Sequence, residues 1–168
     1  MNNSNGQTTT QTAFVLENSF HIIQNAIYIH QNDKNYLIRN IGFEIIFDGL
    51  DDNDSVHILA NIDERIHRKY IYPIIQEMIF GIGAAYAAYM DPSKQVLYVA
   101  GINNPSHNYF NNDRIGVNFN NRKQISFNEI VFDNTISSKI IYMIIYIDKN
   151  KNNMIEQNEI AYITLEIE

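Results

Sequence analysis

The stretch Ile140-Ile141-Tyr142-Met143-Ile144-Ile145-Tyr146-Ile147 decides how this chain folds. It consists of β-branched, aromatic and other apolar residues without Gly or Pro, a composition typical of a β-strand. After a polar interval, residues 162–167 alternate between apolar and polar types with the period of a second strand. We therefore predict that the chain ends in two strands joined by a polar loop.

Segments of similar composition recur along the rest of the chain, separated by Asn-rich and Asp-rich turn clusters at residues 31–35 and 48–54. The predicted strands are residues 13–17, 20–30, 36–47, 55–60, 95–102, 114–119, 124–132, 138–147 and 161–167. About nine strands in 168 residues predict one mainly β domain over residues 13–168. The expected fold class is an antiparallel β-sandwich or a partly closed barrel.

One inserted helical region is expected at about residues 62–90. A capping-box pattern begins at Asn61, Pro73 can open a helix, and apolar residues follow at helical spacing. These residues are Ile74, Ile75, Met78, Ile79, Ile82, Tyr86 and Tyr89. A pair of buried strands is the alternative, since Gly is a poor helix former. The stretch 71–90 nears membrane-spanning length, but with Pro, Gln and Glu at its start we expect a buried core element instead.

The polar loop Asp148–Glu159 carries oxygen-bearing side chains at its first, third, fifth, ninth and twelfth positions, and this spacing resembles the calcium loop of the EF-hand family. The resemblance implies Ca²⁺ as the cofactor and six ligand residues, Met154 through its backbone carbonyl. They are Asp148, Asn150, Asn152, Met154, Glu156 and Glu159. Lys149 and Lys151 are expected to face solvent, and Ile155 to be the apolar residue that fixes the loop against its surroundings.

The resemblance covers the loop alone. Asn153 stands at the sixth position, where the family has Gly because the chain turns sharply, and Asn tolerates that backbone conformation better than other residues. Predicted strands, instead of helices, flank the loop. With so few formal charges among the ligands, we expect a dissociation constant on the order of 10⁻⁴ to 10⁻³ M. The alternative is a polar turn without a metal.

A second acidic cluster lies in the predicted turn at residues 48–54. It contains Asp48, Asp51, Asp52 and Asp54. Four neighbouring carboxylates could form a second cation site, or complete the first one, because a cation relieves their mutual repulsion. The favoured interpretation is a solvated acidic turn.

Composition excludes several function classes. The net charge of −7 argues against a nucleic-acid partner, and the absence of Cys excludes disulfides and thiolate chemistry. The five His residues lack zinc-motif spacing, and no Ser lies in a nucleophile elbow. Residues 1–12 form a polar tail that we expect to be disordered and that lacks the features of a secretory signal, so a cytoplasmic protein or leaderless export is expected.

We accordingly expect a non-catalytic calcium-binding module for binding or adhesion, with a protein or carbohydrate partner. The loop 103–113 mixes amide and aromatic side chains that suit such a surface. The first alternative is a self-assembling structural subunit, a homo-oligomer whose strand edges pair and whose calcium loop stabilises it locally. The second is an enzyme in which Asp52, His57 and His107 meet in space.

Overall fold

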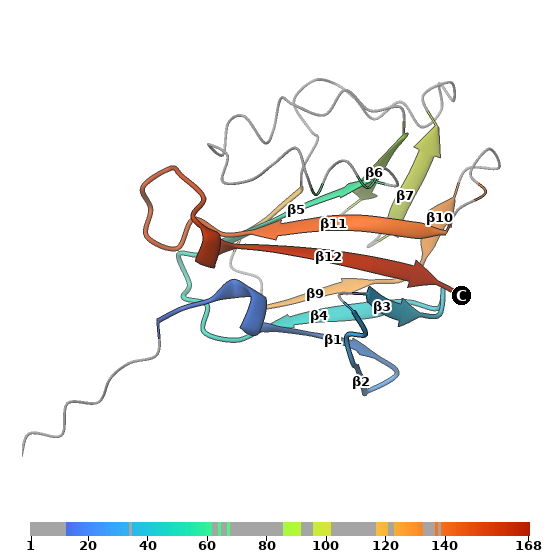
Figure 1. Cartoon of the computed structure of the whole chain (residues 1–168), viewed down its shortest axis with the longest axis horizontal. Coiled ribbons are helices and arrows are strands. Elements are labelled where there is room, and N and C mark those ends of the chain that lie inside the picture. The colour runs from blue at the N-terminus through green and yellow to red at the C-terminus, as the bar shows by residue number, and fades with distance from the viewer. Residues whose placement is uncertain are drawn as a thin grey trace, which may run out of the picture.

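The protein is a two-layered β structure. The computed structural model describes residues 13–33, 35–61, 64, 67, 86–91, 96–101, 117–120, 123–132, 137 and 139–168. Its described strands form two mostly antiparallel sheets instead of one closed barrel, so the fold is a β-sandwich. In Figure 1, strands β11 and β12 of the larger sheet lie above strands β9, β4 and β1 of the smaller one.

The smaller sheet has four antiparallel strands. Their order is β2 (Ile27–Ile29), β1 (Phe20–Gln24), β4 (Phe43–Phe47) and β9 (Gln124–Phe127). Strands β1 and β2 are joined by Asn25 and Ala26, with φ values of 50° and 60°. Two consecutive residues with positive φ are typical of the tight hairpin turn whose twist matches that of the strands.

The larger sheet has eight strands, and the adjacent strands β11 and β12 lie inside it. Its order is β10 (Ile130–Phe132), β7 (Val96–Gly101), β6 (Tyr86–Asp91), β5 (Ser55–Asn61), β11 (Ile140–Tyr146), β12 (Ile160–Ile167) and β3 (Asn35–Ile38), and β8 (Val117–Asn120) also pairs with β5. The pairs β7–β10 and β3–β12 are parallel. Two short 3₁₀ turns, η1 (Leu16–Asn18) and η3 (Gln157–Glu159), complete the described elements.

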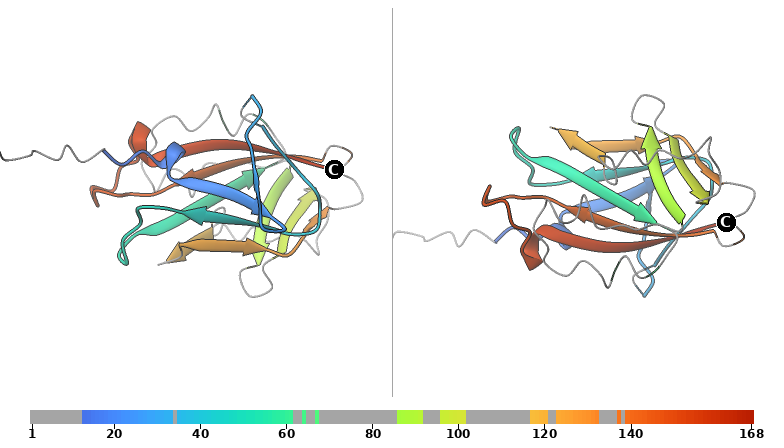
Figure 2. Two further views of the ribbon diagram at one scale, coloured as in Figure 1. Left: turned by 90° about the horizontal axis from the view of Figure 1, so that it is seen from below. Right: turned by 90° about the horizontal axis from the view of Figure 1, so that it is seen from above.

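The core lies between the two sheets, because the alternation of side chains along each strand turns one apolar row inward. The smaller sheet contributes Phe20, Ile22, Phe43, Ile45, Phe47, Ile125 and Phe127. The larger sheet contributes Tyr36, Ile38, Val56, Ile58, Ile141, Met143, Ile145, Ile163, Leu165 and Ile167. The two views in Figure 2 show the strands of both layers around this interior.

The chain passes from the larger to the smaller sheet between β3 and β4. The buried Gln24 side chain fixes this crossover: its Nε2 donates to the carbonyls of Arg39 (2.6 Å) and Gly42 (2.7 Å), and its Oε1 accepts from the Arg39 amide (2.9 Å). The Asn40 side chain donates to the Ile130 carbonyl and accepts from its amide, at 2.9 and 2.8 Å. These bonds join the crossover to both β1 and β10.

The structure confirms the predicted fold class and the position of most strands, with three differences. The predicted strand 13–17 is absent, since residues 13–15 belong to no strand and residues 16–18 form a 3₁₀ turn. The predicted strands 20–30, 36–47 and 124–132 are each divided into two strands, the first by a hairpin turn and the other two where the chain passes between the sheets. Of the predicted helical region, residues 62–85 apart from 64 and 67 lie outside the described residues. Residues 86–90 belong to β6, so the helical prediction is wrong at Tyr86 and Tyr89. Pairing with β7 and the preference of Tyr for strands outweigh the helical spacing there.

No described helix has the length and apolar character needed to cross a membrane. The predicted polar tail, residues 1–12, and most of the apolar stretch 71–90 lie outside the described residues.

Candidate metal site

The calcium-like loop Asp148–Glu159 joins β11 and β12, two adjacent strands of the larger sheet. Where the strands meet the loop, the Ile147 amide donates to the Glu159 carbonyl at 2.9 Å. In Figure 1 this is the long loop at the left of the molecule, with η3 at its end. The predicted strand–loop–strand context is confirmed, so the loop sits on a hairpin and not between two helices.

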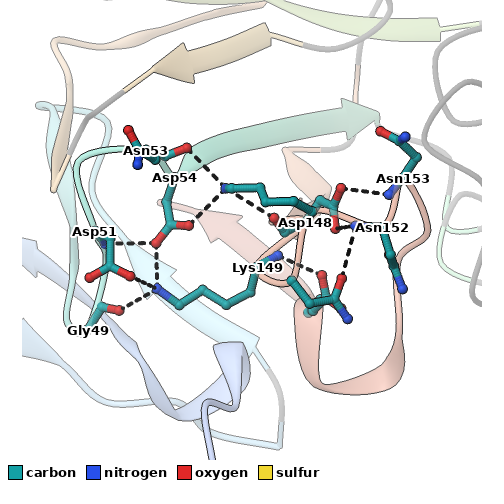
Figure 3. A network of polar contacts seen from close by, with 11 residues as sticks. Gly49, Asp51, Asn53, Asp54, Asp148, Lys149, Asn152 and Asn153 are labelled. Carbon is teal, nitrogen blue, oxygen red and sulfur yellow. Dashed lines mark hydrogen bonds and ion pairs between the residues drawn. The ribbon is translucent and has the colours of Figure 1, made fainter.

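The Asp148 carboxylate organises the first half of the loop. Its Oδ1 accepts the Asn152 amide at 3.1 Å and its Oδ2 accepts the Asn153 amide at 2.9 Å (Figure 3). The Asn150 Oδ1 also accepts the Asn152 amide (3.2 Å), and the Asn152 Oδ1 accepts the Met154 amide (2.9 Å). The side-chain oxygens at the first, third and fifth positions are therefore held toward the backbone amides of the loop.

The backbone conformation at Asn153 matches the expectation for the sixth position. Its φ is +62°, in the left-handed region that the family fills with Gly and that Asn tolerates. Lys151 adopts a similar φ of +60°. The predicted apolar anchor is also confirmed, because Ile155 is only 2% exposed.

Glu156, at the ninth position, lies beside the side chains of the third and fifth. The Asn150 amide nitrogen is 3.4 and 3.3 Å from its two carboxylate oxygens, and the Asn152 amide nitrogen donates to Oε1. Because the oxygen and nitrogen of an Asn amide are assigned from the hydrogen-bond network, a half-turn of either amide would present its oxygen to a cation instead. The loop thus brings together three of the predicted ligand side chains.

Glu159, at the twelfth position, is the most unusual residue of the loop. Its side chain is buried, with 1% exposure, and its Oε2 accepts the Lys149 amide at 2.7 Å. Its Oε1 is also buried and has no hydrogen-bond partner among the described residues. A carboxylate oxygen buried without a partner is costly, so this position favours a cation or another donor.

The prediction that Lys149 and Lys151 face solvent is wrong for Lys149, whose side chain is only 21% exposed. The Lys151 side chain is 51% exposed, as predicted, but its ammonium group also pairs with the other loop. The Lys149 Nζ lies 2.6 Å from Asp54 Oδ2 and 3.0 Å from Asp51 Oδ2, and the Lys151 Nζ lies 3.1 Å from Asp54 Oδ1. The reason is that Asp54 is only 3% exposed, and a buried carboxylate needs a positive partner. Figure 3 shows the Lys149 side chain reaching from the calcium-like loop to Asp51 and Asp54 in the loop between β4 and β5.

Ion pairing holds this cluster in its charged state. Burial of the Asp54 carboxyl would by itself raise its pKa, but hydrogen bonds from Lys149, the Asp51 amide and Lys151 outweigh burial and lower that pKa. Burial would likewise lower the pKa of Lys149, yet its hydrogen bonds to Asp54 and Asp51 raise it. Both groups are therefore ionised at neutral pH.

The acidic turn at residues 48–54 is more structured than a solvated turn. Asp51 and Asp54 pair with lysine ammonium groups, which occupy the position that a second cation would take. Asp48 lies 3.3 Å from His21 Nε2, and Asp52 is exposed. Among the described residues, no group of three or more His, Asp or Glu side chains is placed to hold a metal ion. A calcium site in the loop Asp148–Glu159 must therefore draw on Asn side-chain oxygens and backbone carbonyls in addition to its carboxylates.

The three residues of the catalytic alternative are not brought together among the described residues. The His57 ring stacks on Tyr146 with centroids 4.8 Å apart, and burial lowers the pKa of His57 to about 4, although the charge of Asp148 acts in the opposite direction. His57 is therefore neutral at pH 7. Asp52 is exposed on the turn, and His107, with the rest of loop 103–113, lies outside the described residues.

Comparison with known proteins adds no identification, because neither a family model nor a curated protein matches this chain.

Proposed function

We propose that the loop Asp148–Glu159 binds Ca²⁺ through the side chains of Asp148, Asn150, Asn152, Glu156 and Glu159 and the carbonyl of Met154. The observation that carries this proposal is the buried Glu159 Oε1, which lacks a partner among the described residues. A hard cation that prefers oxygen ligands would satisfy it. The inward-held oxygens of Asp148 and Asn152 and the positive φ of Asn153 support the same assignment.

In this proposal the metal serves a non-catalytic module for binding or adhesion. Calcium would tie the twelve-residue connection to the ends of β11 and β12, which pair over the whole length of β11 in the larger sheet, and so fix the shape of this end of the sandwich. A surface with a fixed shape binds a protein or carbohydrate partner at a lower entropic cost.

Calorimetric titration with Ca²⁺ is the direct test. We expect a single binding event in the range of 10⁻⁴ to 10⁻³ M for the wild type, and a far weaker response to Mg²⁺, which requires a tighter octahedral site. Glu159→Gln should abolish calcium binding because it removes the buried charge. Glu166→Gln is the matched control, since it makes the same chemical change at an exposed position of β12. Absence of binding by the wild type, or equal isotherms for the two variants, would contradict the proposal.

Self-assembly is the second candidate, favoured by exposed apolar side chains where both sheets end. Strands β2 and β3 are the terminal strands of their sheets in the described part of the chain. Four large apolar residues on or beside them are more than half exposed: Ile27 (65%), Tyr28 (57%), Leu37 (51%) and Ile41 (54%). A second copy that pairs with these edges would bury them.

Sedimentation velocity tests this candidate. If copies assemble through β2, the wild type should sediment as an oligomer and the variant Tyr28→Lys should shift toward the monomer. Met154→Lys is a suitable control, because Met154 is exposed to a similar extent (53%) but lies in the calcium-like loop and not at the edge formed by β2. A wild type that remains monomeric at high concentration would exclude assembly through this edge.

A further inference from the structure

We infer that Asp54 is a positioning residue for the calcium site, and that metal binding at residues 148–159 is linked to docking of the loop between β4 and β5. The inference rests on the proposed calcium binding and extends it to a residue that contributes no ligand. Its basis is the bridge that Lys149 and Lys151 form between the two loops.

The first connection runs from Asp54 through Lys149 to Glu159. At one end, the Lys149 Nζ is held by Asp54 Oδ2 (2.6 Å), Asp51 Oδ2 (3.0 Å) and the Gly49 carbonyl (3.1 Å). At the other end, the Lys149 amide donates to Glu159 Oε2 (2.7 Å). The residue that orients the buried carboxylate is therefore itself anchored to the β4–β5 loop, as the close-up in Figure 3 shows.

The second connection runs from Asp54 through Lys151 to Asp148. The Lys151 Nζ donates to Asp54 Oδ1 (3.1 Å), to the Asn53 carbonyl (3.0 Å) and to the Asp148 carbonyl (3.2 Å). Asp148 and Glu159 are the charged first and last residues of the proposed site. Both are thus reached from the same Asp54 carboxylate, one through each of its oxygens.

Charge strengthens this linkage. The proposed ligands include three carboxylates, Asp148, Glu156 and Glu159, and two ammonium groups lie close to them in sequence. Asp54 pairs with both of these ammonium groups. Without Asp54, the lysines would be free to pair with the ligand carboxylates and compete with calcium. Loss of Asp54 should therefore weaken metal binding through both orientation and charge.

Linkage is reciprocal, so calcium should in turn stabilise the docked β4–β5 loop. Two amides report on that loop: the Asp51 amide donates to Asp54 Oδ2 at 2.7 Å, and the Asp54 amide donates to the Asp51 carbonyl at 3.0 Å. Their hydrogen exchange should slow when calcium binds, although neither residue is a proposed ligand. A local metal site without linkage would leave this exchange unchanged.

The test compares the calcium dissociation constants of Asp54→Asn and Asp52→Asn. Both variants lose one negative charge in the same loop, but Asp52 is exposed and is not part of the lysine bridge. Loss of a residue that orients a metal ligand typically weakens binding 10–100-fold, so we expect a change of at least about tenfold for Asp54→Asn. For Asp52→Asn we expect a change within about twofold. Circular dichroism of both variants verifies folding.

The outcomes separate the linkage from the proposed function. No calcium binding by the wild type would overturn both. Calcium binding by the wild type with equal constants for the two variants would overturn the linkage alone. If Asp54→Asn does not fold, exchange at the Asp51 and Asp54 amides of the wild type decides the question, and rates unchanged by calcium overturn the linkage.

Discussion

Replacing Asp54 by alanine is expected to lower the free energy of unfolding by about 3–5 kcal/mol. The Asp54 carboxylate is 3% exposed and accepts hydrogen bonds from two lysines and from the Asp51 amide. Its removal leaves the Lys149 ammonium, whose side chain is 21% exposed, without its nearest partner. Breaking a buried pair from one side costs more than a surface pair contributes, because the remaining ammonium loses its strongest compensation and keeps only Asp51, whose side chain is exposed, and the Gly49 carbonyl.

Urea denaturation of the wild type and the variant, without calcium, measures this effect. Asp52→Ala is the control, and we expect a change within about 0.5 kcal/mol because its side chain is exposed on the same turn. A change below about 1 kcal/mol for Asp54→Ala would show that the lysine bridge adds little to stability.

The effect of Asp54→Ala should depend on pH. Because its hydrogen bonds lower the pKa of Asp54 in the folded protein, the carboxylate contributes stability above its unfolded pKa, which is about 3.9. That contribution is lost as the pH falls through the lowered folded pKa. The difference between wild type and variant should therefore be full at neutral pH and shrink in strong acid.

Much of the fold could be predicted from local patterns. The β-branched runs correctly located strands such as β5 and β11, because side-chain alternation and β-propensity act over a few residues. Within the loop, the sequence also correctly predicted the burial of Ile155 and the left-handed conformation of Asn153. Calcium binding itself stays a prediction.

The role of the two lysines could not be predicted in this way. Lys149 and Lys151 lie 95 and 97 residues away from Asp54, and the sandwich topology alone brings them together. When ligand and non-ligand residues alternate along a loop, the residues between the ligands are expected to point to solvent. The available signal was the presence of two lysines in one loop and four aspartates in the other, but that signal does not say which carboxylate is buried.

The end of the predicted helical region failed for a related reason. Tyr86 and Tyr89 fit a helical spacing, yet Tyr also favours strands, and their partners in β7 lie at Gly101 and Tyr98. A short segment whose residues fit a helical spacing but prefer strands is decided by the strand that pairs with it and not by the segment itself. A similar argument applies to segment 20–30, which was predicted as one strand but in which two residues with positive φ make a hairpin.

The crossover between the sheets leads to the second large effect: Gly42→Ala is expected to lower the free energy of unfolding by about 3–5 kcal/mol. Gly42 has a φ of +97°, which side-chain-bearing residues rarely adopt and which costs about 1–3 kcal/mol when forced. A Cβ there would also lie 2.4 Å from the Asn128 carbonyl oxygen and 2.8 Å from that of Phe127. Relief of that overlap requires a backbone shift, and overpacking of this kind typically costs another 1–3 kcal/mol.

Gly49→Ala is the matched control, because Gly49 also has a positive φ, +73°, but its nearest neighbour to an added Cβ is the Phe14 ring at 3.9 Å. The cost there should be about 1–2 kcal/mol, from the backbone conformation alone. Urea denaturation of both variants thus separates the conformational cost from the steric one. If the two variants lost equal stability, the backbones of the β3–β4 crossover and of the turn after β9 would not be in contact.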